Sequence, residues 1–465
     1  MSFCGFPMVS VRQYITQHFF RSPTRVAITL FTLLVFAGTL LLRLPLATTS
    51  GQISFIDALF TTVSAVSVTG LGVVDTGTYF TAFGQVVIML LVQLGGVGIM
   101  TFSTLFILMA GRKPGIVAGQ TIQDTYTQTG DRSPLDILKA VLVLTFAIEA
   151  VGVAILACCF LREMAWPQAL YTGLFHSICA FCNAGFSLFP DNLMRYRADW
   201  WVSLTVAVLI ILGGTGFLVM TDIHRAAKFR GKAWRRLSLQ TKLVLSITGI
   251  LLVSSTLIIM WMERGHTLHN LPLNQKILAS FFEAVTARTA GFNTIDHAAM
   301  ANETLFFVII LMFIGAAPGS CAGGVKITSV SILVLLGIAH FKGEDRPQIF
   351  YRSINKSFVD KAISTVFLSM IAVFAVTMCV EMAEEFNAFL PRGHDKFLDI
   401  LFEVVSAFGT VGLSTGFTSK FTSLGKFFLV IMMVVGKLGM MTLIFAMSQR
   451  RIKKYFYAEE NVMIS

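Results

Sequence analysis

SAVSVTGLG, residues 64 to 72, decides the fold because closely related segments return three more times along the chain. The later copies are CAFCNAGF at 179–186, VTARTAGF at 285–292 and SAFGTVGL at 406–413. Aligned without gaps, all four place a glycine at one position and a phenylalanine ten residues before it. These residues are Gly70, Gly185, Gly291 and Gly412, preceded by Phe60, Phe175, Phe281 and Phe402. Four segments that match at two fixed offsets predict an internal fourfold repeat.

The composition predicts a multi-pass membrane protein. Of 465 residues, 55% are hydrophobic and only 13% are charged, which no ordinary soluble domain shows. The formal net charge of +11 comes largely from basic residues gathered in alternate connectors, including seven between Arg225 and Lys242. This distribution is typical of cytoplasmic loops in a lipid bilayer. It lacks the aromatic interleaving or zinc-ligand spacing of a nucleic-acid-binding protein, so we expect no nucleic acid partner.

The apolar runs predict one structural unit that occurs four times: a span, a half-helix that dips into the membrane, a glycine loop and a second span. The predicted repeats are residues 26–112, 135–224, 241–340 and 358–449. Basic residues mark residues 1–25 as a cytoplasmic N-terminal segment and residues 450–465 as a cytoplasmic C-terminal tail. The predicted fold is therefore an all-α membrane protein with eight transmembrane helices around a pseudo-fourfold pore, as in potassium channels.

The repeated loops suggest a filter for cations. Non-helical backbone survives at membrane depth only where it is buried in protein or lines a water-filled path. Loop carbonyl oxygens can replace the water shell of an alkali ion, and glycine allows the backbone angles that this requires. A single such glycine would more simply indicate a tight turn or a helix contact, but four in register favour the filter. The candidate ion-binding residues are Val68, Thr69, Gly70, Leu71, Asn183, Ala184, Gly185, Phe186, Thr289, Ala290, Gly291, Phe292, Thr410, Val411, Gly412 and Leu413.

Four longer motifs carry a resemblance to a known family: VTGLGVVDTG (68–77), NAGFSLF (183–189), RTAGFNTID (288–296) and TVGLSTG (410–416). They resemble the filter sequences of the Trk/Ktr/HKT superfamily of potassium uptake proteins, and the resemblance covers almost the whole chain. The chain is most similar to KtrB, the membrane subunit of the bacterial Ktr system, because one span precedes Gly70 where Trk-type members usually have two more. Gly70 itself is what potassium-permeable members show.

The resemblance implies a function, a location and partners. It implies potassium uptake, with sodium as a coupling ion or symported ion, across the cytoplasmic (inner) membrane. It also implies a homodimer on a cytoplasmic ring of KtrA-like subunits that bind ATP or ADP. This chain has no nucleotide-binding glycine motif after a strand, so we expect the nucleotide only on the partner and no cofactor in this chain.

GAAPGSCAGG, residues 315–324, interrupts the second span of the third repeat. A helix does not easily continue through Pro318 and several glycines, so the span should break within the membrane. By resemblance, this segment is the intramembrane loop that gates permeation below the filter; the alternative is a kink used only for packing. The candidate gate residues are Gly315, Pro318, Gly319, Ser320, Gly323, Gly324 and Lys437.

Lys437 stands in the middle of the last span, in MVVGKLGMM (433–441). A charge at that depth is costly, so we expect it to face the interior and to find oxygen partners, such as the carbonyls of residues 315–324. Family members usually have arginine here, and lysine keeps the charge but lacks the planar fork of donors. Alternatively, Lys437 pairs with a buried acid or extends to the membrane surface and takes no part in gating.

The remaining polar residues of the spans are predicted to be structural. Asp57, Asp399, Glu149, Glu283 and Arg288 are expected to anchor half-helices by hydrogen bonds and ion pairs; the alternative is that charges at the outer mouth concentrate cations. His176 is expected to be packed, and the Cys179–Cys182 pair to be buried thiols and not a transition-metal site.

Two other functions compete with the channel-like interpretation. One is a Trk-type or sodium-permeable transporter with alternating access, which usually has two repeats and carboxylates at the midplane. The other is a membrane enzyme, for which we find no nucleophile–base or metal constellation in the sequence. The chain is therefore predicted not to be an enzyme.

Overall fold

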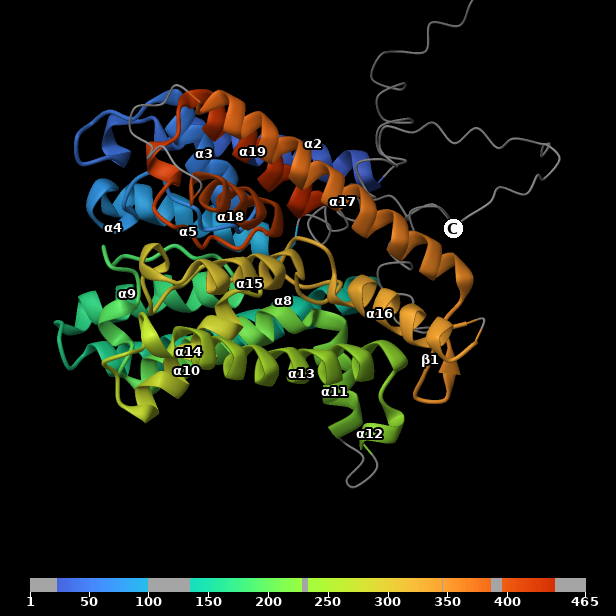
Figure 1. Cartoon of the computed structure of the whole chain (residues 1–465). Helices are drawn as coiled ribbons and strands as arrows, with labels where there is room; N and C mark the ends of the chain where they lie inside the picture. Colours follow the sequence, from blue (N-terminus) through green and yellow to red (C-terminus); the bar gives the residue numbers. More distant parts are fainter. Residues whose placement is uncertain (1–22, 99–133, 228–232, 345, 386–394, 440–465) are drawn as a thin grey trace, which may run out of the picture.

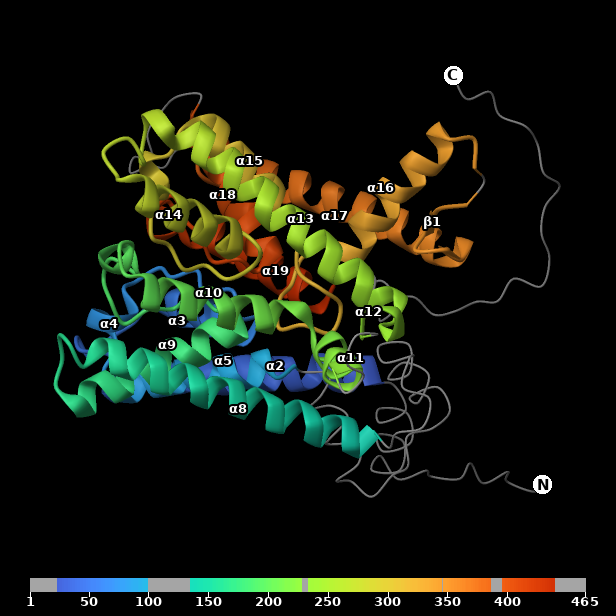
Figure 2. The same cartoon turned by 90° about the horizontal axis from the view of Figure 1, so that it is seen from below.

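The computed structural model describes residues 23–98, 134–227, 233–344, 346–385 and 395–439. Apart from one small hairpin, β1 (Gln348–Ile349) with β2 (Arg352–Ser353), the regular elements of these residues are helices (Figures 1 and 2). The helices of residues 23–227 are α2 (Pro23–Leu42), α3 (Phe55–Val66), α4 (Thr76–Tyr79), α5 (Ala82–Gly96), α8 (Pro134–Phe160), α9 (Trp166–Cys182), α10 (Trp200–Thr215) and α11 (Phe217–Ala227). Those of residues 233–438 are α12 (Ala233–Arg236), α13 (Leu239–Met262), α14 (Leu273–Thr286), α15 (Asn302–Phe313), α16 (Ile327–Phe341), α17 (Lys356–Ala383), α18 (Asp395–Gly409) and α19 (Ser423–Leu438). Five short 3-10 helices occur at Pro45–Ala47, Met194–Tyr196, Glu263–Gly265, His297–Ala299 and Thr418–Lys420.

Four short helices stand where the sequence predicts half-helices: α3, α9, α14 and α18. Three of them pack against a helix of the preceding predicted repeat: α9 against α5, α14 against α10 and α18 against α15. The last helix, α19, returns to pack against α3. The chain therefore closes on itself, and Figure 1 shows the first helices beside the last ones, with the middle of the chain below them.

Among the residues that the structure describes, three helices are long and apolar enough to cross a membrane: residues 139–160, 239–265 and 356–383. The bent pair α10–α11 would make a fourth. The other apolar helices, α2, α3, α5, α15 and α16, are shorter. Eight full spans therefore stay a prediction, because the last residues of the first and fourth predicted repeats, 99–112 and 440–449, lie outside the described residues. The structure also leaves undescribed residues 113–133 of the connector after the first repeat, residues 1–22 of the N-terminal segment and the whole C-terminal tail, residues 450–465.

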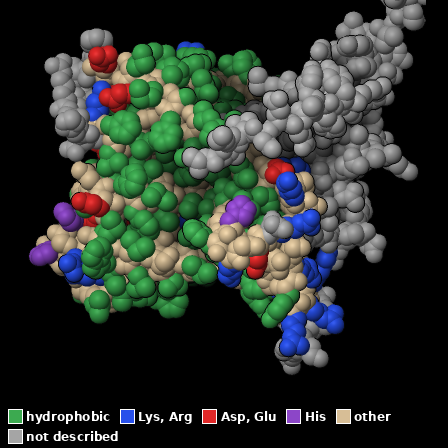
Figure 3. Space-filling model, turned by 45° about the vertical axis from the view of Figure 1, so that its right-hand side comes forward, with side chains coloured by type: hydrophobic (Ala, Val, Ile, Leu, Met, Phe, Trp, Pro, Cys, Tyr) green, Lys and Arg blue, Asp and Glu red, His purple; other side chains and the backbone are tan. Residues whose placement is uncertain are grey.

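Hydrophobic side chains cover much of the face of the molecule shown in Figure 3. Phe36 on α2, Val143 on α8, Val253 on α13 and Phe374 on α17 each expose more than half of their area. Exposed apolar area on this scale marks a membrane or protein contact and would not be stable in water. The surface therefore agrees with a chain that lies in a lipid bilayer.

Small residues allow close packing behind three of the loops. Gly95, Gly213 and Gly436 face the carbonyl oxygens of Val66, Phe181 and Phe408, and a side chain at any of these glycines would overlap the oxygen. Each of those carbonyls stands four residues before its repeated glycine. A close contact between a second span and the loop therefore recurs at equivalent positions of these three repeats.

The second span of the predicted repeat 135–224 is not straight. The chain bends by 98° between α10 and α11. Gly216 at the bend has φ +85°, and a Cβ there would lie 2.7 Å from the carbonyl oxygen of Pro318. The segment around Pro318, about a hundred residues later in the chain, lies against this bend, where the Phe217 N–H donates to Gly319 O at 3.2 Å.

Candidate functional site

The four repeated loops share an unusual backbone conformation. The residue shortly after each half-helix has a positive φ: Val68 +59°, Asn183 +61°, Thr289 +73° and Thr410 +50°. Non-glycine residues rarely adopt this conformation, and such strain persists only where the surroundings impose it. Three of the following glycines, Gly70, Gly291 and Gly412, also have positive φ. The repeat seen in the sequence is therefore also a repeat of backbone geometry at these positions.

The four glycines converge on one point. A Cβ on Gly70 would overlap the backbone nitrogen of Gly185, and a Cβ on Gly185 would lie 2.6 Å from the backbone of Gly291. A Cβ on Gly291 would lie 3.0 Å from the Cα of Gly412, and a Cβ on Gly412 would overlap the carbonyl oxygen of Thr69. The loops thus form a ring in chain order, with the last loop returning to the first.

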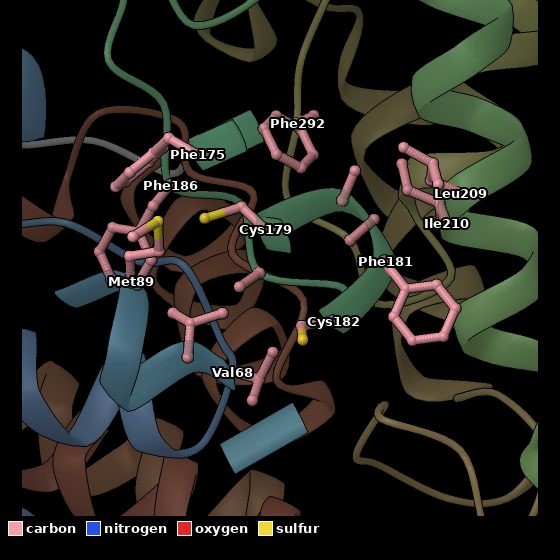
Figure 4. Close-up of a cluster of buried hydrophobic side chains, with 14 of the residues drawn as sticks. Val68, Met89, Phe175, Cys179, Phe181, Cys182, Phe186, Leu209, Ile210 and Phe292 are labelled. Atoms are coloured by element: carbon pink, nitrogen blue, oxygen red, sulfur yellow. The ribbon is translucent and has the colours of Figure 1, made fainter. Parts of the chain in front are cut away.

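The other candidate ion-binding residues lie in these same loops. They are almost fully buried, and Figure 4 shows Val68, Phe186 and Phe292, from three different repeats, around the end of α9. The buried members are Val68, Thr69, Leu71, Asn183, Ala184, Phe186, Thr289, Ala290, Phe292, Thr410, Val411 and Leu413. The structure therefore brings all four predicted segments to one place.

Short hydrogen bonds hold the ring from within the repeats. The Thr286 hydroxyl donates to the Phe292 carbonyl at 2.5 Å, and the Gly412 N–H donates to the Ser406 hydroxyl at 3.1 Å. The Asn192 side chain donates to the Gly185 carbonyl at 3.3 Å. These contacts restrain the glycine segments, whose backbone would otherwise be free to move.

The predicted break in the third repeat is confirmed, since α15 ends at Phe313 and α16 begins at Ile327. The segment between them is fastened on one side to the end of α10, where the Ala317 N–H donates to Gly214 O at 3.1 Å and the Cys321 N–H to Gly213 O at 3.4 Å. On its other side, the Gly324 N–H donates to Gly436 O at 3.3 Å.

The same segment touches the ring itself. The Gly323 N–H donates to the Thr410 hydroxyl at 2.9 Å, and Thr410 stands two residues before Gly412. The Ser320 hydroxyl donates to the Ala317 carbonyl at 2.6 Å and closes the turn that contains Pro318. Residues 315–324 therefore lie directly against the fourth loop.

Lys437 has a partner of the predicted kind. Its ammonium group donates to the Cys321 carbonyl at 2.6 Å. The described residues provide no ion-pair partner for Lys437, so the alternative in which it pairs with a buried acid is not what the structure shows there. The side chain is partly buried and binds the middle of the segment 315–324.

Lys326 is a further residue of this site that is not among the gate residues predicted from the sequence. Its ammonium group donates to the Ala322 carbonyl at 2.6 Å, next to the carbonyl that Lys437 binds. The available signal was its place at the end of the glycine segment, where the apolar run resumes. Two lysines therefore hold consecutive carbonyls of one loop.

The polar residues predicted to be anchors have specific partners. Asp57 forms an ion pair with Lys426 at 2.7 Å and so ties the first repeat to the fourth. Glu149 accepts from the Gln93 amide at 3.0 Å. Arg288 donates to the Thr248 hydroxyl at 3.2 Å, while Glu283 binds His297.

The buried thiols and His176 are packed, as predicted. Cys179 and Cys182 are free and fully buried in the cluster of Figure 4. His176 stacks on Phe189 with ring centroids 4.9 Å apart. Within the part of the chain that the structure describes, no group of three or more His, Cys, Asp or Glu residues is placed to hold a metal ion.

We expect Gly216→Ala to destabilise the protein by about 1–3 kcal/mol. Gly216 has a backbone conformation that is open almost only to glycine, and its Cβ would lie 2.7 Å from Pro318 O. The measurement is the temperature at which the detergent-solubilised protein loses its monodisperse elution peak. The control is Gly249→Ala on α13, where a Cβ meets nothing within 4 Å. Equal thermal stability of the two variants would show that the bend does not depend on glycine.

Comparisons with known proteins show the family of the chain. The TrkH family of cation transport proteins matches residues 7–455. The Ktr system potassium uptake protein B of Bacillus subtilis is 38% identical over 445 residues, which cover 95% of this chain and 96% of that protein. The potassium/sodium uptake protein NtpJ of Enterococcus hirae is 34% identical over 451 residues, covering 95% and 97%.

A third relative and one solved structure extend the comparison. The Ktr system potassium uptake protein B of Vibrio alginolyticus is 35% identical over 438 residues, which cover 93% of each chain. The crystal structure of the potassium transporter TrkH from Vibrio parahaemolyticus has a TM-score of 0.72 at 17% identity and covers 92% of this chain and 85% of that one. The family match spans nearly the whole chain, and three relatives exceed 30% identity; the chain therefore belongs to the TrkH family of cation transport proteins.

Proposed function

We propose that this chain carries potassium ions into the cell across the cytoplasmic membrane, through the ring formed by its four glycine loops. The observation that carries the proposal is the meeting of Gly70, Gly185, Gly291 and Gly412 in chain order. Relatives of nearly equal length are named potassium uptake proteins, which supports the choice of ion. The proposed function requires a path for the ion through the protein and no covalent chemistry.

The chemistry of the ring suits a weakly hydrated monovalent cation. Backbone carbonyls can replace the water shell of the ion, and none of the sixteen candidate ion-binding residues is acidic. The half-helices α3, α9, α14 and α18 end at the ring, so the negative ends of their dipoles favour a cation there. An inside-negative potential adds about 2.3 kcal/mol of driving force per charge for each 100 mV.

Residues 315–324 and Lys437 form the proposed gate. Pro318 lies in the irregular segment between α15 and α16, the carbonyl of Gly319 accepts the N–H of Phe217 at 3.2 Å, and the Gly323 N–H donates to the Thr410 hydroxyl in the fourth loop. Gly315 and Gly324 fold the two ends of the loop together, since the Gly315 N–H donates to Val325 O at 2.8 Å. In this position the loop restricts the path below the ring, and Lys437 holds it there by its charge-assisted hydrogen bond.

The finer assignments extend the same proposal. The chain works as a homodimer on a KtrA-like cytoplasmic ring, with ATP or ADP bound by that ring and sodium as a coupling ion. The name "Ktr system" of two relatives supports a partner subunit. The basic connector between Arg225 and Lys242 is a candidate docking surface for the ring, and lipid phosphates attract the same charges.

A second candidate is a Trk-type or sodium-permeable transporter that works by alternating access. It is kept because one relative is named a potassium/sodium uptake protein. Ion currents across a planar bilayer separate the two candidates, since turnover limited to transporter rates would favour alternating access.

The test of the main proposal is growth at low potassium in a bacterial host that lacks its own uptake systems. The chain is expressed with its cytoplasmic partner, and its presence in the membrane is verified by immunoblot. Rescue of growth, together with potassium influx into proteoliposomes that contain the purified protein, is the expected result. Absence of both, with the protein present in the membrane, overturns the assignment.

A further inference from the structure

Three half-helices carry a buried polar side chain that reaches the chain beyond the glycine of the same repeat. On α9, His176 Nε2 lies 3.0 Å from the Ser187 hydroxyl. On α14, a carboxylate oxygen of Glu283 lies 2.8 Å from His297 Nε2. On α18, Glu403 binds three groups of the chain after Gly412.

The contacts of Glu403 are the most extensive. One carboxylate oxygen accepts from the Ser414 hydroxyl at 2.6 Å and from the Thr415 N–H at 3.1 Å. The other oxygen accepts from the Thr418 hydroxyl at 2.5 Å. Glu403 is fully buried, so these donors replace the water that its carboxylate would otherwise need. The segment after Gly412 is thus fastened at three points.

The three contacts occur at corresponding places in their repeats. Ser187 and Ser414 stand two residues after their glycines, while His297 and Thr418 stand six residues after theirs. The half-helix partners stand nine residues before the glycine for His176 and Glu403, and eight before it for Glu283. Different side chains therefore make one recurring connection, which is the mark of a structural requirement and not of a single chance contact.

The first repeat is held differently. The described side chains of α3 make no hydrogen bond to residues 70–77, and Ser64 is buried without a partner. Gln85 of α5 instead donates to the carbonyls of Gly77 at 3.2 Å and Phe80 at 3.0 Å. The restraint in the first repeat therefore acts farther from the glycine and comes from the second span.

We propose that His176, Glu283 and Glu403 are positioning residues that set the ion preference of the ring. This inference rests on the proposed function. Each residue fixes the chain on the far side of its glycine, and the fixation is strongest at Glu403, because both of its buried carboxylate oxygens have donors. A carbonyl ring of fixed size suits potassium, whereas a ring that can contract also suits the smaller sodium ion. Loss of one connection should therefore lower selectivity more than it lowers the transport rate.

The test compares initial rates of potassium and sodium influx into proteoliposomes. Glu403→Ala is expected to lower the potassium-to-sodium ratio about tenfold, equivalent to about 1.4 kcal/mol. Glu403→Gln should restore most of the ratio, because its amide oxygen still accepts from Ser414 and Thr415, and the Thr418 hydroxyl can accept from its NH2 group. The matched control is Ser280→Ala on α14, a buried hydroxyl without a partner, which should leave the ratio unchanged.

The outcomes separate the inference from the proposed function. If the wild-type chain moves no potassium, the proposed function fails. If it does and Glu403→Ala keeps the wild-type ratio, Glu403 is merely structural and the inference is wrong. If Glu403→Ala does not purify as a monodisperse protein, the test uses Thr418→Val and Ser414→Ala, which remove donors to Glu403. A fall of about threefold in the potassium-to-sodium influx ratio of either variant supports the inference. Wild-type ratios in both variants refute it.

Discussion

Gly70→Ala is expected to reduce potassium influx by about one hundredfold or more, and to abolish growth at low potassium. Gly70 has φ +87°, which alone costs an alanine about 1–3 kcal/mol. The added methyl group would also overlap the backbone nitrogen of Gly185 in the next loop. Backbone atoms cannot move aside as the end of a flexible side chain can, so the ring itself must open. Influx into proteoliposomes and growth in the uptake-deficient host measure the effect.

The control for Gly70→Ala is Gly51→Ala. Gly51 has a similar φ of +70°, but a Cβ there meets nothing within 4 Å. The two substitutions share the backbone strain, and only Gly70→Ala adds the collision within the ring. We expect Gly51→Ala to fold and to transport at close to the wild-type rate. Wild-type influx through the Gly70→Ala protein would mean that the meeting point of the four loops is not the path of the ion.

Lys437→Met is expected to increase influx about tenfold. The substitution keeps a side chain of similar length but removes the hydrogen bond to the Cys321 carbonyl, and such charge-assisted bonds contribute about 1.5–3 kcal/mol. The loop 315–324 should then leave its position below the ring more often. Cys321, which is buried in the structure, should also react faster with a membrane-permeant maleimide. Influx and the rate of Cys321 labelling are measured on the same preparation.

Lys437→Arg is the matched control for the charge. Arginine keeps the positive charge and presents a fork of donors to the loop carbonyls, so influx should stay at or below the wild-type level. Lys326→Met should have a smaller effect, since Lys326 binds Ala322 within its own segment and does not join the loop to another helix. If Lys437→Met changes neither influx nor labelling, Lys437 contributes packing and the loop is held by its backbone contacts alone.

The half-helices and the break at Pro318 were predictable because their signals are local. A glycine at a fixed offset, a short apolar run and a proline among glycines each restrict the backbone of their own segment. The carbonyl partner of Lys437 could be expected because burying a charge within the membrane costs free energy unless oxygen atoms lie close to it. These elements depend little on the rest of the fold.

The bend at Gly216 and the contacts of Glu403 were not predictable because they depend on distant segments. Trp201 to Asp222 has the composition of a continuous span, and the segment around Pro318 that lies against the bend at Gly216 is distant in the sequence. Glu403 was not among the candidates, because a single acid in an apolar half-helix gives no indication of which hydroxyls will face it. Lys326 was overlooked for a similar reason, since its partner carbonyl belongs to an irregular loop.

The ring of Gly70, Gly185, Gly291 and Gly412 is built from a single polypeptide, and this has a genetic consequence. In a pore made of four identical subunits, one codon change alters all four quarters at once. Here each codon change alters one quarter, so Val68 can stand where the other repeats have Asn183, Thr289 and Thr410. A substitution in one loop therefore changes one quarter of the ring and leaves the residues of the other three loops as they are.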